Sequence, residues 1–128
     1  VNLKKNIKYL ASDALEGRLT GSKGEKAAGK YIADLLKQYS VKPYTGNSYY
    51  QNFDYNVRLQ PMDSSSTIKW HGSNVIGFLD NHAKKTIVIG AHYDHLGRNE
   101  HHHSTKMNSD GEIHNGADDN ASGTATVL

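Results

Sequence analysis

Near the N-terminus, the apolar residues recur with the spacing of an α-helix. Leu3, Ile7, Leu10 and Leu15 fall on one side, and the lysines between them fall on the other. The pattern predicts an amphipathic first helix that begins near Leu3 and is ended by Gly17.

A second helix has a clear predicted start. Ser22 is followed three residues later by Glu25, which is the pattern of a capping box. The apolar face then runs from Ala28 to Tyr39. Pro43 stops the helix, because the residue before a proline avoids the helical region of backbone space.

The pattern then changes to a period of two, which is typical of strands. Apolar and polar residues alternate over residues 53–59 and predict a half-exposed strand, and residues 61–66 form a polar turn region. Residues 67–70 and 74–79 are predicted to form two shorter strands.

One continuous apolar run, Thr-Ile-Val-Ile-Gly-Ala at residues 86–91, is typical of a strand buried on both faces of a sheet. A long polar loop rich in His and Gly follows over residues 92–116, and a helix starts at Asp118. Two helices, several strands and then strand–loop–helix predict an α/β domain of which this chain is the first part.

Composition narrows the function classes. A chain of 128 residues with 36% hydrophobic residues suits one globular core. The net charge is only +2, and the Lys and Arg residues are spread along the chain, so we expect no nucleic-acid partner. The absence of Cys excludes disulfides, thiolate metal sites and a Cys nucleophile. No apolar stretch approaches the roughly 20 residues of a membrane span, and Val1 leads into a Lys-rich segment that does not have the pattern of a signal peptide.

Two motifs carry candidate chemistry. The first, Gly-Ala-His-Tyr-Asp-His-Leu-Gly at residues 90–97, places His92 and Asp94 at the end of the predicted buried strand, the edge where α/β sheets bind ligands. A neutral His is a good zinc ligand, and a nearby carboxylate can fix its tautomer. The alternative interpretation of this His–Asp pair alone is an ordinary surface turn.

The second motif is Asn-Gly-Ala-Asp-Asp-Asn-Ala-Ser-Gly at residues 115–123. Asn-Gly is a common turn, and Asp or Asn before a helix is a common cap. Two adjacent carboxylates exceed what one cap requires, however, and crowded carboxylates usually need a cation or a proton to coexist. A carboxylate here is therefore a candidate bridge between two metal ions.

Together the motifs resemble the co-catalytic zinc aminopeptidases, whose superfamily includes glutamate carboxypeptidase, glutaminyl cyclase and the transferrin receptor ectodomain. The segment Leu-Ala-Ser-Asp-Ala-Leu-Glu-Gly-Arg at residues 10–18, followed by Gly-Ser-Lys-Gly at residues 21–24, is similar to the bacterial branch. The resemblance thus extends from about Leu10 to Leu128. It implies a three-layer domain with a mixed central sheet flanked by helices.

The resemblance also implies roles for individual residues. His92 would ligate one zinc ion, and Asp94 would orient His92 without binding metal. Asp119 would bridge the two zinc ions, with Asp118 as its non-ligating neighbour, and His95 and Asp118 are possible pocket residues. A zinc-activated hydroxide would then attack the scissile carbonyl of a peptide substrate.

Other parts of the family's site are expected outside this chain. The adjacent Glu-Glu pair that supplies the general base, a further acid and a His would follow residue 128. We therefore expect residues 1–128 to be the N-terminal portion of one catalytic domain that ends early in the helix after the Asp-Asp-Asn motif. The segment between Tyr50 and Asn74 is too short for an inserted protease-associated domain. Such a portion is expected to be inactive alone and to self-associate, and the resemblance favours a secreted or periplasmic protein.

Two alternatives share the fold: a glutaminyl cyclase-like acyltransferase with one zinc ion, and a non-catalytic binding ectodomain. A metallo-β-lactamase pattern, His-x-His-x-Asp-His, fits poorly, because its leading His would fall at Gly90. The three adjacent His residues at 101–103 are interpreted as a solvated segment.

Overall fold

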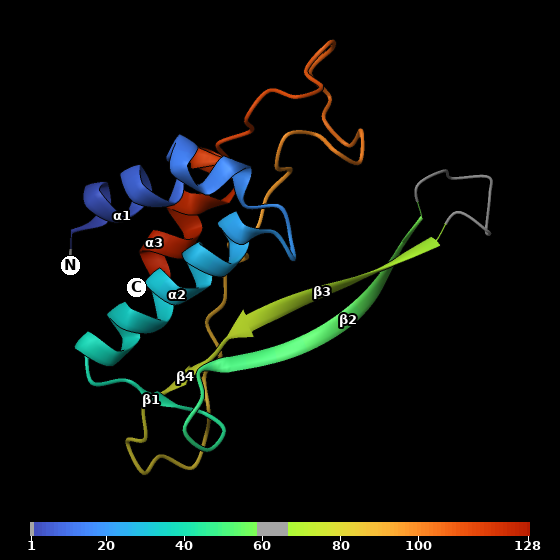
Figure 1. The fold of residues 1–128 in the computed structure, drawn as a ribbon. Coiled ribbons are helices and arrows are strands. Elements are labelled where there is room, and N and C mark those ends of the chain that lie inside the picture. Colours follow the sequence, from blue (N-terminus) through green and yellow to red (C-terminus); the bar gives the residue numbers. More distant parts are fainter. Residues whose placement is uncertain (1, 59–66) are drawn as a thin grey trace.

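The computed structural model describes residues 2–58 and 67–128, and confirms the predicted mixed α/β class. Its three helices gather at one end, while two long strands extend away from them (Figure 1). The elements are α1 (Leu3–Leu10), the 3-10 segment η1 (Asp13–Arg18), α2 (Lys23–Gln38), β1 (Lys42–Pro43), β2 (Tyr50–Arg58), β3 (Thr67–Val75), β4 (Gly77–Phe78), the kinked turn η2 (Ala117–Ser122) and α3 (Gly123–Val127).

A small apolar core holds the N-terminal helices to the end of the chain. Leu10, Leu15, Ala28 and Ala121 form one buried cluster that draws on α1, η1, α2 and η2. Burying one leucine side chain stabilises a fold by about 1.5–3 kcal/mol. The core thus fixes η2 against α1, although the two elements lie at opposite ends of the chain.

The first helix is shorter than predicted. It ends at Leu10, and Ser12 is extended, with φ −80° and ψ 152°. The carbonyl groups at the end of the helix are bound by side chains from outside the helix. The Leu10 carbonyl contacts the guanidinium of Arg18, and the Ala11 carbonyl accepts from the Asn115 amide at 2.9 Å. Tertiary contacts therefore replace the next helical turn.

The second helix begins where the sequence predicted, and its cap is half of the predicted capping box. Ser22 Oγ accepts a hydrogen bond from the backbone N–H of Glu25 at 3.1 Å. The Glu25 carboxylate does not return to the cap; instead it accepts a hydrogen bond from the Tyr93 hydroxyl at 2.8 Å.

The strands form two antiparallel pairs. β2 pairs with β3 from Tyr50 opposite Val75 to Arg58 opposite Thr67, and β1 pairs with β4. The prediction of separate strands at 67–70 and 74–79 was wrong, because pairing with the long β2 carries β3 through the polar residues between them. Leu59 and the predicted turn at 61–66 lie outside the described residues.

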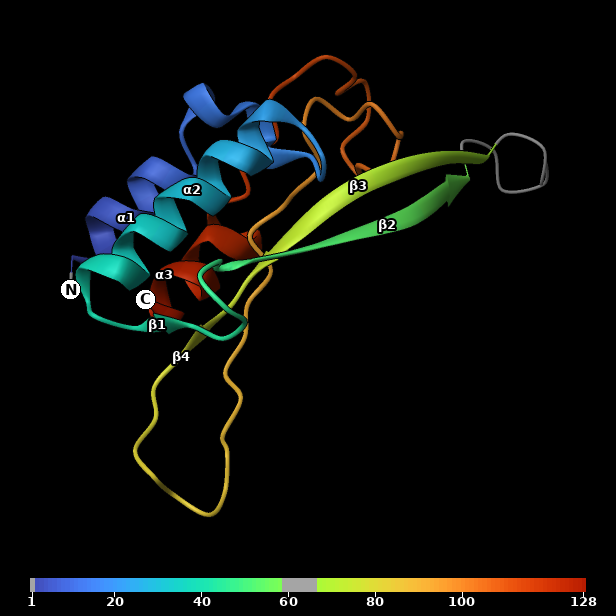
Figure 2. The same ribbon diagram turned by 60° about the horizontal axis from the view of Figure 1, so that its bottom comes forward.

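The apolar run at residues 86–91 is not a buried strand. Ile87, Val88 and Ile89 are 85%, 89% and 74% exposed. This segment belongs to a long excursion between β4 and the loop that follows (Figure 2). A buried strand requires partners along its edges and cover on its faces, and residues 2–58 and 67–128 supply neither to this segment. No helix in these ranges is both long and apolar enough to cross a bilayer.

Candidate metal centre

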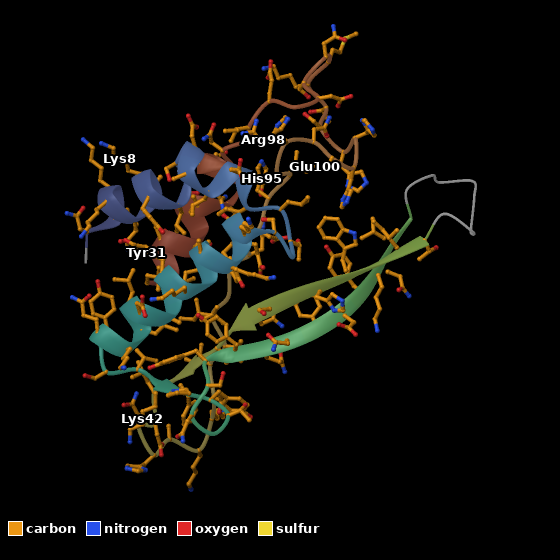
Figure 3. All side chains as sticks on the ribbon, in the orientation of Figure 1. Lys8, Tyr31, Lys42, His95, Arg98 and Glu100 are labelled. Atoms are coloured by element: carbon orange, nitrogen blue, oxygen red, sulfur yellow. The ribbon has the colours of Figure 1, made fainter. Side chains whose placement is uncertain are left out.

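The candidate site lies where the polar loop 92–116 meets the N-terminal segment. A single parallel bridge joins Leu19 to His95, with the His95 N–H donating to the Arg18 carbonyl at 3.0 Å. The Gly97 N–H donates to the carbonyl of Gly17, also at 3.0 Å. Figure 3 shows His95 at the base of this loop, next to the helices. The start of the loop is thus fixed to a segment far away in the sequence.

The two predicted metal ligands lie next to each other. His92 Nε2 is 2.9 Å from Asp119 Oδ1. The other ring nitrogen, Nδ1, lies 3.2 Å from the Asp94 carbonyl oxygen and 3.4 Å from Asp94 Oδ1. When Nδ1 carries the proton toward Asp94, Nε2 presents a lone pair to a carboxylate. Two acceptors at this distance need a cation or a proton between them.

The donor set and its spacing fit zinc. Zinc accepts imidazole nitrogen at about 2.0–2.1 Å and carboxylate oxygen at about 2.0–2.2 Å, so two ligands of one tetrahedral ion are roughly 3.3 Å apart. The separation of 2.9 Å between His92 Nε2 and Asp119 Oδ1 is shorter than this value and is that of a direct imidazole–carboxylate contact, so the two side chains would move slightly apart to hold one ion. In the described part of the chain, no group of three or more His, Cys, Asp or Glu side chains surrounds a metal position. His92 and Asp119 therefore amount to a partial ligand set.

Asp94 is held by a residue that the sequence analysis did not identify. Thr20 Oγ1 donates to Asp94 Oδ2 at 2.6 Å, while Asp94 Oδ1 faces His92. The hydroxyl thereby orients the carboxylate toward the imidazole. Metal-bound His residues commonly have such a partner, which fixes the tautomer and the ring plane.

The backbone of η2 separates the two adjacent carboxylates. Its angles leave the helical region at Asp119 (φ −110°, ψ 93°) and Asn120 (φ −138°, ψ 40°). Both residues are exposed, but Asp119 faces His92, whereas the backbone carbonyl of Asp118 accepts from Ser122 Oγ at 2.8 Å. The local kink thus gives the two Asp residues different surroundings.

The His95 side chain lies beside Asp119. Its side chain is 14% exposed, and its Nδ1 lies 4.0 Å from Asp119 Oδ2. Burial lowers the pKa of the His95 imidazole, and the Asp119 carboxylate partly opposes this shift. His95 is therefore neutral at neutral pH. Its ring occupies the space next to Gly116, where an added Cβ would lie 2.6 Å from the ring.

The side chains of His92, Asp94, His95 and Asp119 line a cavity of about 320 Å³. Tyr55 and Val57 of β2 supply one wall, which the sequence analysis did not predict. Residues 101–103 are also not simply a solvated segment, because His101 packs edge-to-face on Trp70 with ring centres 4.7 Å apart. A larger groove of about 470 Å³ between α1 and α2 contains none of the predicted ligands. Besides His92, Asp94, His95 and Asp119, the lining includes Leu19, Thr20, Tyr55, Val57, Leu96, His101 and His103.

Further hydrogen bonds anchor the backbone on both sides of His92. Thr124 Oγ1, in α3, donates to the His92 carbonyl at 2.9 Å. The Tyr93 hydroxyl contacts the Glu25 carboxylate and the Ser73 carbonyl, and burial raises the pKa of this tyrosine. The His92 segment is thereby tied to α2, β3 and α3.

Comparison with known families bears on this geometry. The family model described as Peptidase family M28 matches residues 74–128, a stretch that contains both His92 and Asp119. No curated protein and no solved structure was found to match the chain. Over residues 74–128, the family match confirms the resemblance that the two motifs indicated, to a family of peptidases.

Proposed function

We propose that the parent protein is an aminopeptidase, which hydrolyses N-terminal residues from peptides with two zinc ions bound at a centre built on His92 and Asp119. The convergence of His92 Nε2 and Asp119 Oδ1 at 2.9 Å is the observation that carries this proposal. The family match over residues 74–128 supports it. Zinc at this position would supply an activated water and polarise the scissile carbonyl.

The protein's own side chains have separate roles in this proposal. Thr20 holds Asp94, and Asp94 keeps the proton of His92 on Nδ1, so that Nε2 is free to bind metal. The two oxygens of Asp119 face different neighbours, with Oδ1 toward His92 and Oδ2 toward His95. A carboxylate with its oxygens turned apart is suited to bridge two ions.

A complete site needs more than these groups. A catalytic zinc ion normally has three protein ligands, and His92 and Asp119 are two. On this proposal, residues 1–128 are part of one catalytic domain, and a general base and further ligands come from residues outside 1–128. The cavity next to Asp119 then receives the N-terminal residue of the peptide, whose free amine lies among the carboxylates.

Substrate requirements test the proposal directly. The intact protein loaded with zinc is expected to hydrolyse an aminoacyl-anilide and to leave the N-acetylated form of the same substrate uncut, because the acetyl group removes the free amine. A chelator should abolish turnover, and added zinc should restore it. Release of ammonia from an N-terminal glutaminyl peptide, without anilide hydrolysis, would instead favour the cyclase.

Residues 1–128 alone are expected to show no chelator-sensitive hydrolysis of the same anilide. The reason is that a two-ligand site holds catalytic zinc poorly, and that the sequence of residues 1–128 contains no adjacent Glu-Glu pair, from which the resemblance expects the general base. Turnover by the isolated polypeptide that a chelator abolishes would contradict the proposed division of the site.

A further inference from the structure

Arg18 is a buried cation beside the candidate metal centre. Its side chain is 0% exposed, and within residues 2–58 and 67–128 its guanidinium donates to backbone carbonyl groups. Nε donates to Tyr93 at 2.6 Å, Nη1 to Asn115 at 2.7 Å, and Nη2 to Gly116 at 3.0 Å. Nη1 also contacts the Leu10 carbonyl.

These carbonyls belong to the two segments that carry the predicted ligands. Tyr93 lies between His92 and Asp94, and Asn115 and Gly116 open the motif that contains Asp119. A guanidinium group is planar and presents five donors in a fixed fork. One rigid group therefore spans both segments and sets their separation.

The charge of Arg18 also acts on the site. Burial lowers the pKa of the guanidinium from its ordinary value of 12.5, while the charges of Asp94 and Asp119 oppose this shift. Arg remains protonated in proteins, so the cation persists at neutral pH. It offsets part of the repulsion between carboxylates that gather around a site without metal.

The backbone that places the Arg18 side chain is in a conformation that L-residues rarely adopt. Glu16, Gly17 and Arg18 have φ values of 46°, 71° and 50°, all in the left-handed region. Residues other than Gly rarely adopt this region, and such strain tends to occur at functional sites. The conformation turns Arg18 inward between the two ligand-bearing segments.

We infer that Arg18 is a positioning residue for the metal centre: its forked hydrogen bonds to the Tyr93 carbonyl and to the Asn115 and Gly116 carbonyls hold the segments of His92 and Asp119 close enough together to share one zinc ion. This inference rests on the proposed function, because it presumes that His92 and Asp119 bind metal.

The first test measures zinc affinity in the intact protein by competition with a chromophoric chelator. Arg18→Lys keeps the charge but lacks the fork, and Arg18→Met lacks both. Each is expected to weaken zinc binding by about 10- to 100-fold, the usual effect of losing a residue that orients metal ligands. If Arg18→Lys or a folded Arg18→Met retained the parental affinity within threefold, the positioning role would be wrong.

A matched control separates positioning from general stability. Ile32→Ala removes a buried side chain of α2 that does not line the candidate cavity. It is expected to lower the melting temperature while leaving zinc affinity within threefold of the parent. An equal loss of zinc affinity in Ile32→Ala would overturn the inference, because destabilisation alone would then explain the Arg18 variants.

A second readout needs no metal. In the zinc-free protein, backbone amides at residues 93–95 and 115–119 are expected to exchange with solvent faster in Arg18→Lys than in the parent, and unchanged exchange there would overturn the inference. If the parent itself bound no zinc that His92→Ala removes, the proposed function would fail, and amide exchange would still decide whether Arg18 holds the segments together.

One further variant decides the question if neither Arg18 variant folds. Asn115→Ala removes the other hydrogen bonds that hold this segment to the N-terminal region, those from the Asn115 amide to the Ala11 carbonyl and to Asp13 Oδ1 at 2.7 Å. It leaves the bonds from Arg18 to the Asn115 and Gly116 carbonyls in place. Zinc affinity within threefold of the parent would support the inference, and a loss of tenfold or more would overturn it, because the Asn115 side chain would then hold the segment.

Discussion

Replacing His92 with alanine is expected to remove stoichiometric zinc binding and to lower peptide hydrolysis by at least about a thousandfold. His92 is the only neutral nitrogen ligand proposed here, and its Nε2 lies 2.9 Å from the carboxylate that would share the metal. Losing it leaves Asp119 without its partner. The measurement is zinc stoichiometry by calorimetry together with turnover of an aminoacyl-anilide, both in the intact protein.

Two variants make this prediction specific. His82→Ala removes a histidine that is also exposed and also faces an aspartate, Asp80, at 3.5 Å, so its zinc binding and turnover should match the parent. Asp94→Asn keeps the ligand but loses the carboxylate behind it, and is expected to weaken zinc affinity by about 10- to 100-fold. If His92→Ala retained the activity of the parent, His92 would not belong to the catalytic centre.

Local sequence patterns correctly predicted an element that is stabilised by contacts between residues close in sequence. The second helix combines a cap at Ser22 with a continuous apolar face, and the structure forms it over Lys23–Gln38. The first helix has the same periodicity through Leu15, yet it ends at Leu10. There the Leu10 and Ala11 carbonyls contact the side chains of Arg18 and Asn115, and a pattern of apolar spacing carries no information about such polar contacts.

The apolar run at 86–91 shows a different limit. Its composition describes a tendency to become buried, and burial depends on other strands. In the described residues, the ladders are β1 with β4 and β2 with β3, and neither includes Ile87–Ile89. The apolar pattern therefore predicted burial of residues 86–91, but no neighbouring strand among the described residues pairs with them.

The motifs located the candidate ligands better than the groups that hold them. His92 and Asp119 each belong to a recognisable sequence motif, and the structure brings the two side chains together. Thr20 lies 74 residues from Asp94, so no short motif contains both. Arg18 is the last residue of the motif at residues 10–18. Its hydrogen bonds to the Tyr93 and Gly116 carbonyls, however, are apparent only in the folded structure.

The second large effect is expected at Gly17, where Gly17→Ala should destabilise the protein by about 2–5 kcal/mol. The left-handed backbone, with φ 71°, costs an alanine about 1–2 kcal/mol. The new Cβ would also collide with the Gly97 carbonyl oxygen and lie 2.7 Å from the His114 carbonyl oxygen, and such overpacking costs about 1–3 kcal/mol more. Both neighbours are backbone atoms, so neither can rotate away.

Gly46→Ala is the matched control, because Gly46 has a φ of 56° and no heavy atom within 4 Å of the added Cβ. It should lose only the conformational part, about 1–2 kcal/mol. Urea unfolding of both variants measures the difference. Since folded proteins are stable by only about 5–15 kcal/mol, Gly17→Ala should also loosen the bond from the Gly97 N–H to the Gly17 carbonyl that holds the ligand loop. Equal losses in the two variants would show that the close contact of Gly17 with Gly97 does not hold in solution.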